Sequence, residues 1–367
     1  MHILKDASRR LFLRQAGALS TIAGVGAPLA LNLAAMGSAA AGTPGDYKAI
    51  VCLFLFGGND AYNMVLPTES ASWQAYTTTR NQAPDSIALL AAGTAPNPTA
   101  AVGSPARLGG VLPLSVLRPQ GRSFALHPML PAVKELFDTQ RRVAVLPNIG
   151  PLVMPTTKVQ YGNAAYPKPA RLFSHNDQQN TWQALSPEGS TRGWGGRMAD
   201  QLAALNGTPI FTAVSATGNS VWLSGDQVVQ YQVGSGGATP LGVDSSGRLY
   251  GSAAAGAALQ RVASMARNTH PLDADVATIG ARSIAAEQLL RTALRPASDP
   301  AFGTPPASGT TYNASNDPKL RYLNPLTGAM ASNALAAQLQ VVARMIDAGM
   351  SGATGARRQV FFVSLGG

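Results

Sequence analysis

The chain has 367 residues, of which 46% are hydrophobic and 13% are charged, and its formal net charge is +10. This composition suits a globular protein of one or two domains with a large core. The single cysteine, Cys52, excludes an intramolecular disulfide and a cysteine-based metal site. Because no dense Lys/Arg run is interleaved with aromatic residues, we expect no nucleic-acid partner.

The first residues resemble an export signal. Residues 8–13 read SRRLFL, a twin-arginine signature, and a mildly apolar stretch follows from Ala16 to Ala35. Small residues around Ala41 suit cleavage. We therefore predict a twin-arginine signal peptide over residues 1–41 and a periplasmic or secreted product. Gly and Pro make the stretch weakly apolar, so we expect no stable membrane span after cleavage; a membrane anchor is the alternative.

Residues 48–67 read KAIVCLFLFGGNDAYNMVLP and organise the predicted fold. The apolar run at 49–56 predicts a central parallel strand that is buried on both faces. It ends at Gly57-Gly58, where a side chain would block a tight turn. Asp60 would then lie just past the carboxyl end of the strand, where open α/β sheets place their ligands. We interpret Asp60 as a metal ligand; the alternative is that Asn59 and Asp60 only shape a turn.

The rest of the chain predicts further helices and strands, separated by irregular passages rich in Gly and Pro. The apolar runs predict strands at 142–148, 209–215 and 358–365, and the 3.6-residue periodicity predicts helices at 128–137, 174–185, 193–205, 275–294 and 331–349. A β-rich insertion is expected at about 217–255 and a long loop at about 295–326. The fold class is therefore α/β, with residues 42–367 forming the main domain.

A second informative stretch, FSHNDQQNTW at 173–182, begins one of these helices. Ser174 or Asn176 can cap the helix. A serine there also faces free backbone N–H groups, so it is a place to hold a phosphate or sulfate, or to carry a nucleophilic oxygen. His175 is a candidate metal ligand or acid. The alternative is an ordinary polar cap beside a surface histidine.

Two other polar residues have open roles. Arg197 follows the glycine-rich GWGG run and is either a partner for an anionic group or a surface arginine. His127 precedes Pro128 at a predicted helix start, and we expect it to cap or pack there rather than to bind metal.

Several motifs together resemble a known family. FLFGGNDAYNMVLP, FALHPMLPAVKELFDTQRRVAVLPNIG, FSHNDQQNTWQ, GWGGR and the closing LAAQLQVVARMIDAG…RRQVFFVSLGG occur in the same order in bacterial twin-arginine-exported proteins grouped as domain of unknown function 1501. That family looks like a branch of the alkaline phosphatase and sulfatase superfamily. The resemblance implies a mixed, mostly parallel sheet with helices on both faces, and often divalent metal ions. It implies that Asp60 is the first-strand metal ligand, and that Ser174 occupies the nucleophile position beside His175.

The chain departs from the family at its end. Family members continue past VFFVSLGG into segments that bear further Asp and His ligands, whereas this sequence stops at Gly367. We therefore expect either a missing C-terminal part or a shortened variant. Only His127, His175 and His270 remain after signal removal, too few for two convincing metal sites.

Two functions follow as hypotheses. The first is a metal-dependent hydrolase of phosphate or sulfate esters, in which Asp60 holds a divalent metal, Ser174 attacks, and Asn59, Asn63 and Arg197 bind the anionic substrate. The second is a non-catalytic exported protein that binds or assembles and retains the fold. A third hypothesis, an exported redox enzyme, has less support than the other two. The sequence contains no GxGxxG fingerprint, haem motif or cysteine cluster.

Overall fold

The structure is a computed structural model that describes residues 47–57, 59–244, 246–265, 270–325 and 327–366. The predicted signal peptide, residues 1–41, lies outside the described residues. The described chain divides into two compact units. The first contains residues 47–54, 151–320 and 334–365, and the second contains residues 55–150, 321–333 and 366.

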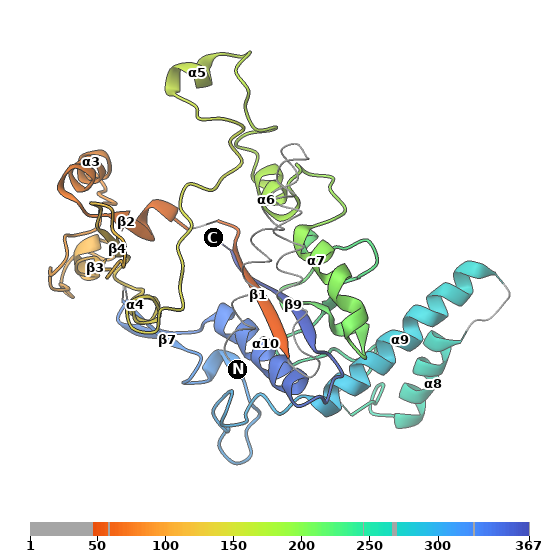
Figure 1. Ribbon diagram of the computed structural model, residues 1–367. Helices are drawn as coiled ribbons and strands as arrows, with labels where there is room; N and C mark the ends of the chain where they lie inside the picture. The colour runs from red at the N-terminus through yellow and green to blue at the C-terminus, as the bar shows by residue number, and fades with distance from the viewer. Residues whose placement is uncertain (1–46, 58, 245, 266–269, 326, 367) are drawn as a thin grey trace, which may run out of the picture. The chain divides into compact units, whose positions relative to one another are not determined.

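A four-stranded sheet forms the centre of the first unit (Figure 1). Its strands are β1 (Lys48–Leu55), β5 (Ala213–Ser215), β6 (Tyr231–Gln232) and β9 (Arg358–Leu365), in the order β1-β9-β5-β6. Strand β5 pairs in parallel with both neighbours, with Val214 opposite Phe361 of β9. The sheet is parallel throughout, which confirms the predicted α/β class at this level.

Strand β9 is interior, and its alternating side chains contact helices on both faces. Phe361 and Val363 join a buried cluster with residues of the helices α9 (Pro271–Ala293) and α10 (Ala334–Met350). Phe362 points the other way, and its ring centroid lies 5.8 Å from that of Trp222. The unbroken RQVFFVSL run of β9 is therefore explained by burial on two sides.

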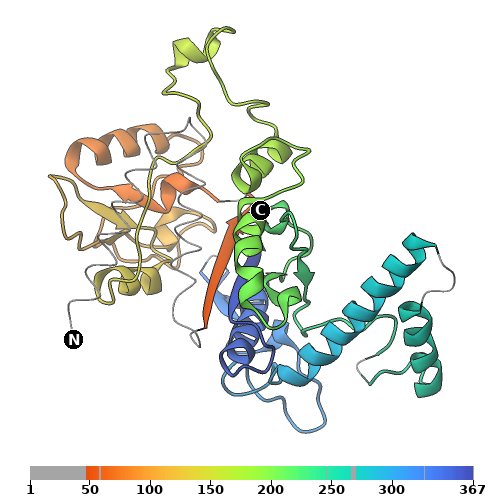
Figure 2. The same ribbon diagram turned by 45° about the vertical axis from the view of Figure 1, so that its right-hand side comes forward.

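The remaining helices of the first unit are α5 (Lys158–Gly162), α6 (His175–Ala184), α7 (Trp194–Leu202) and α8 (Ala253–Ser264), with 3-10 turns η3 (Ala203–Leu205), η4 (Pro209–Phe211), η5 (Val221–Leu223) and η6 (Ala314–Asn316). Of these helices, α6 and α7 agree with predicted helices, whereas α5 and α8 were not predicted. Figures 1 and 2 show α6 beyond the end of the sheet at which β9 ends. Among the described residues, the helices are too short or too polar to cross a bilayer.

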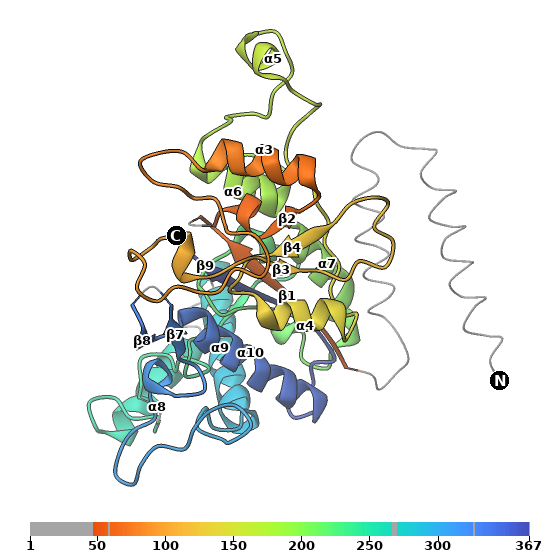
Figure 3. The same cartoon turned by 90° about the vertical axis from the view of Figure 1, so that its left-hand side faces the viewer.

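The second unit has its own small antiparallel sheet, in the order β2-β4-β3. Its elements are η1 (Ala61–Asn63), β2 (Val65–Pro67), α3 (Ser70–Arg80), η2 (Pro105–Arg107), β3 (Leu112–Pro113), β4 (Phe124–Leu126) and α4 (Pro131–Asp138), and a hairpin of β7 (Tyr322–Asn324) and β8 (Ala329–Ala331). Figure 3 shows α3 and α4 on opposite sides of this sheet. Leu66, Leu89, Val111 and Ala125 form its core.

Two strand predictions are wrong in detail. Residues 142–148 are irregular, and Leu146 is 77% exposed, so this apolar run finds no strand partner within the part of its unit that the structure describes. Positive φ angles at Arg141 and Asn148 interrupt the extended backbone at both ends. Strand β1 lies at the edge of its sheet rather than at the centre, which leaves Val51 and Leu53 partly exposed.

The predicted β-rich insertion at 217–255 is also wrong. Apart from isolated bridges, its described strand content is β6, which joins the main parallel sheet rather than forming a hairpin. The predicted strand at 209–215 begins instead with the turn η4, because Pro209 lacks a ladder donor. At Gly57 an added Cβ would meet nothing within 4 Å, so the expected steric reason for that glycine does not hold; Gly58 lies outside the described residues.

Part of the predicted loop at 295–326 forms β7, while residues 295–320 are irregular apart from η6 and are held by polar side chains. Asp317 is 3% exposed and accepts hydrogen bonds from Tyr312 Oη (2.7 Å), from the backbone and hydroxyl of Thr304 (2.8 Å each) and from the Lys319 N–H (2.9 Å). Gln340 of α10 donates to the carbonyl oxygens of Ala297 and Phe302 and to Tyr312 Oη. This network explains how an irregular segment keeps one conformation.

Candidate functional site

Asp60 lies at the start of η1 and is bound by an arginine from the end of α3. Its Oδ1 accepts the Tyr62 N–H at 3.1 Å, as expected for a capping side chain. Arg80 donates to both carboxylate oxygens, from Nη2 to Oδ1 at 3.1 Å and from Nη1 to Oδ2. A bidentate guanidinium occupies the directions in which a carboxylate would otherwise bind a cation.

Arg80 is also held by two aromatic rings. Its guanidinium carbon lies 5.5 Å from the ring centroid of Tyr62 and 6.0 Å from that of Tyr76. The hydrogen bond with Asp60 raises the pKa of Arg80 further above its usual range. Asp60, Arg80 and the two tyrosines therefore form one polar and aromatic cluster at the end of α3, which we call the Asp60–Arg80 cluster.

Asn63 connects this cluster to the next part of the chain. Its Oδ1 accepts the Tyr76 hydroxyl at 2.6 Å, and its Nδ2 donates to the Ile87 carbonyl oxygen at 3.0 Å. The Tyr76 oxygen in turn accepts the Leu89 N–H at 2.7 Å. Both polar atoms of the Asn63 amide are thus used within the unit, whereas Asn59 is exposed.

Ser174 caps α6, as predicted. Its Oγ accepts the Asp177 N–H at 3.5 Å, and a hydrogen bond from the Ser174 side chain is the largest influence that lowers the pKa of Asp177. Asp177 is buried, accepts the Glu188 N–H at 2.9 Å and pairs with Arg171 at 3.2 Å. The serine hydroxyl and the buried carboxylate therefore act together at the helix start. His175, the first helical residue, is exposed.

The GWGG run before Arg197 is explained by close packing. An added Cβ at Gly193 or Gly196 would lie 2.1 Å from backbone atoms of Val221 or Ser224. A Cβ at Gly195 would lie 2.5 Å from the Trp222 ring. The three glycines therefore allow α7 to lie against the chain around η5. Arg197 itself is exposed on α7.

His127 contributes to the turn before α4 but does not cap this helix, whose N-cap is Leu130 without a side-chain hydrogen bond. The His127 Nδ1 accepts the Met129 N–H at 3.1 Å, at the turn that precedes α4. Burial lowers the pKa of His127. The neutral imidazole supplies the acceptor atom of this turn, so the observed contact is structural.

The predicted site residues fall in two groups. Asn59, Asp60 and Asn63 belong to the second unit, around η1, while Ser174, His175 and Arg197 belong to the first unit, on α6 and α7. Within the second unit, the structure joins Asp60 and Asn63 through Arg80 and Tyr76. The sequence motifs did not single out Arg80 and Asp177, the partners that the structure gives to Asp60 and Ser174.

The carboxylates of Asp60 and Asp177, which lie at or beside the predicted site residues, already have protein partners. In the part of the chain that the structure describes, no group of three or more His, Cys, Asp or Glu side chains is placed to hold a metal ion. The Asp60 carboxylate is bound by Arg80, and the Asp177 carboxylate by Arg171 and backbone. A metal needs several unpaired oxygen or nitrogen ligands that converge on one point. These two carboxylates do not supply such a set.

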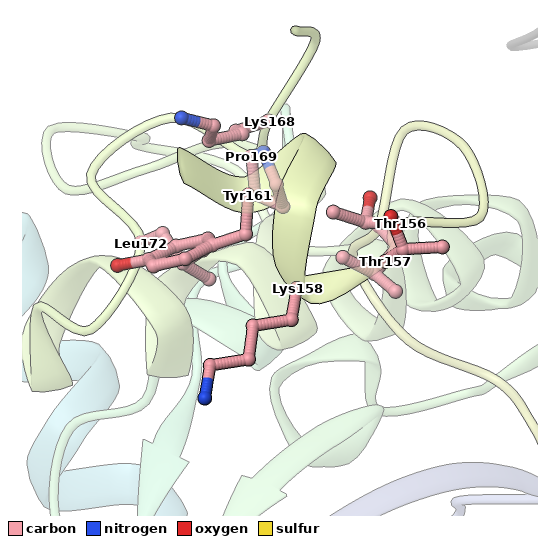
Figure 4. Close-up of a pocket in the computed structure, with 8 residues that line it drawn as sticks. Thr156, Thr157, Lys158, Tyr161, Lys168, Pro169 and Leu172 are labelled. Atoms are coloured by element: carbon pink, nitrogen blue, oxygen red, sulfur yellow. The ribbon is translucent and has the colours of Figure 1, made fainter. Parts of the chain in front are cut away.

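A pocket of about 250 Å³ lies in the first unit, where residues 152–172 fold around α5 (Figure 4). The eight described residues that line it include two lysines and no acidic residue: Leu152, Thr156, Thr157, Lys158, Tyr161, Lys168, Pro169 and Leu172. Tyr161 and Leu172 lie side by side, and Lys158 and Lys168 extend in opposite directions. Lys168 Nζ lies 5.2 Å from the Tyr161 ring centroid. The pocket thus has an apolar floor and cationic ends, and we call it the lysine pocket.

Comparison of the chain with protein-family models, with curated proteins and with solved structures found no match. The resemblance to the exported family therefore stays a prediction.

Proposed function

We propose that this chain is an exported α/β protein that binds phosphate- or sulfate-bearing ligands and retains an alkaline-phosphatase-like fold. The parallel sheet with helices on both faces is the coarse architecture that such a fold requires. The sequence motifs around Asp60 and Ser174 support the finer assignment. Export as a folded protein by the twin-arginine pathway, into the periplasm or beyond the cell, belongs to the same proposal.

The ligand class follows from charge. The sequence carries 28 Lys and Arg residues against 18 Asp and Glu residues, which favours anionic partners by long-range attraction. The lining of the lysine pocket is cationic, because it includes Lys158 and Lys168 and no acidic residue among its described members. An anionic group bound by one ammonium can place an apolar body against Tyr161 and Leu172.

One observation carries the choice of binding over hydrolysis: the bidentate ion pair of Asp60 with Arg80. Asp60 is the residue that the resemblance assigns to the metal, and its carboxylate is already neutralised by a fixed cation. Displacing Arg80 would break two charge-assisted hydrogen bonds and its contacts with two aromatic rings. We therefore assign Asp60 a structural role.

The second candidate is the metal-dependent ester hydrolase. It is favoured by the Ser174 hydroxyl, which lies at a helix start and shares a hydrogen bond with a buried carboxylate, Asp177. A carboxylate beside a serine hydroxyl can accept its proton during attack on an ester.

Calorimetry tests the proposal by measuring how tightly the protein binds inorganic phosphate, sulfate and a phenyl phosphate ester. Lys158→Glu and Lys168→Glu should each weaken binding at least fivefold, since each replaces an attractive charge by a repulsive one. Arg142→Glu, the same change of charge at an exposed site in the other unit, is the matched control. Binding that is absent, or that falls equally in all three variants, contradicts the proposal.

A further inference from the structure

Helix α9 exposes an apolar stripe on its N-terminal half. Leu272, Val276 and Ile279 are 67%, 66% and 63% exposed. Their spacing of four and then three residues places them along one side of the helix. Three large apolar side chains aligned in this way differ from the scattered single residues that ordinary surfaces expose.

The same stripe is buried further along the helix. Continuing the spacing beyond Ile279 passes the exposed Ser283 and leads to Ala286 and Leu290, which lie in the main core of the first unit with Phe361 and Met345. One side of α9 therefore carries apolar residues in both halves of the helix, with Ser283 between them. Its C-terminal half is covered by the core, and its N-terminal half extends past the core with the same character.

Helix α8 adds to the exposed face. The two helices run side by side and in opposite directions (Figures 1 and 2), with Ser264 at the end of α8 and Pro271 at the start of α9. They approach closely at Gly280, where an added Cβ would lie 2.0 Å from the Ala263 carbonyl oxygen. Val262 of α8 is 51% exposed. Val262 and Ile279 each lie one residue before the contact residue of their own helix, Ala263 and Gly280. Because the helices are antiparallel, these two positions lie on the same face of the pair.

Two opposite charges border this face. Asp275 and Arg282 are exposed and lie two helical turns apart, on the side of the stripe away from α8. If two copies of α9 cross antiparallel at residues 278–279, Asp275 of each copy lies opposite Arg282 of the other. The pattern of charge is thus complementary to itself about a two-fold axis.

We propose that the exposed face of the α8–α9 pair binds a second copy of this chain, forming an antiparallel four-helix interface. Leu272, Val276 and Ile279 of the two copies pack at its centre, Val262 packs beside them, and two Asp275–Arg282 pairs fix the direction. The antiparallel arrangement directs the two α9 C-terminal halves, and the cores around them, to opposite ends of the interface. A lipid surface is a poorer occupant, because helices that bind membranes usually border the apolar face with basic residues of one sign.

Sedimentation velocity of the purified full chain tests this proposal. We expect a dimer that becomes monomeric in Ile279→Glu, since a buried unpaired carboxylate opposes the interface. Ala285→Glu, which places the same charge at an exposed position on the other side of α9, should remain dimeric. Circular dichroism establishes that each variant is folded.

A charge exchange keeps the test independent of folding. Asp275→Arg should raise the dimer dissociation constant about tenfold or more, because it faces Arg282 of the other copy. The double variant Asp275→Arg with Arg282→Asp should restore the dissociation constant of the wild-type dimer, because opposite charges face each other again. A wild-type chain that is monomeric at micromolar concentration, a dimer unaffected by Ile279→Glu, or a double variant as weak as the single one would each overturn the proposal.

Discussion

Arg80 donates to both carboxylate oxygens of Asp60, and the pair closes the turn after β1 onto the end of α3. The residue that the sequence assigns to a metal thus has a protein cation as its partner. Since Tyr62 and Tyr76 hold the same guanidinium, the cluster is a structural element of the second unit.

The Asp60–Arg80 pair should contribute modestly to stability. Asp60→Ala should lower the free energy of unfolding by about 0.5–1 kcal/mol, because the pair is partly exposed. Arg80→Ala should cost more, because it also removes the contacts with two rings. The double variant should cost less than the sum of the single ones, as measured by urea unfolding. Strict additivity would show that the two side chains do not interact.

Ser174→Ala tests the role of the helix cap. We expect a loss of about 1 kcal/mol in the free energy of unfolding, the usual contribution of a capping hydroxyl. Ser174→Asp should recover most of it, because aspartate also caps. Ligand binding measured by calorimetry should be unchanged in both. Abolished ester hydrolysis in a folded Ser174→Ala protein would instead favour the hydrolase candidate.

Gly196→Ala tests the packing of α7. A Cβ there would meet the Ser224 backbone at 2.1 Å, so α7 must shift, and we expect a loss of about 3 kcal/mol. Gly236→Ala, in the same unit, is the control, because its Cβ would meet nothing within 4 Å. Thermal unfolding of both proteins measures the difference. Equal melting temperatures would contradict the close approach.

Asp317 should make the loop at 295–320 sensitive to acid. Burial alone would raise the pKa of Asp317, but hydrogen bonds from Tyr312, Lys319 and Thr304 lower it to about 2. A carboxylate with a depressed pKa stabilises the fold above its unfolded pKa of about 4, and this stabilisation is lost as pH falls from about 4 to about 2. Hydrogen exchange of the loop should therefore accelerate over that range.

Asp317→Asn is the matched variant for this prediction. It should cost about 2 kcal/mol at neutral pH, because it weakens several hydrogen bonds to a charged group. Its loop should exchange quickly at all pH values and lack the transition between pH 4 and pH 2. A wild-type transition that persists unchanged in the variant would assign it to other carboxylates.

Local signals in the sequence predicted most helices and the longest interior strand. The Ser174 cap, the apolar spacing of α10 and the run of β9 each depend on residues close in sequence. The run at 142–148 was misread because pairing depends on a distant partner strand, which apolar composition does not reveal. The β-rich insertion predicted at 217–255 was wrong for the same reason, because strand pairing depends on partners that are distant in sequence.

The candidate site was predictable in part. The Ser-x-x-Asp spacing at 174–177 is a capping pattern and could have revealed Asp177. Arg80 had no comparable signal, because it meets Asp60 through the length and direction of α3 rather than through sequence spacing. The conflict between Asp60 as a metal ligand and as an arginine partner therefore emerges only in three dimensions.

Metal content measured together with ester hydrolysis tests the central claim most directly. The purified full chain is incubated with zinc, manganese or calcium, freed of excess ion, analysed by mass spectrometry for bound metal, and assayed with phosphate and sulfate esters. We predict that wild type and Asp60→Ala carry the same metal content and lack ester hydrolysis. A stoichiometric metal ion and a hydrolytic activity that are both lost in Asp60→Ala would contradict the account.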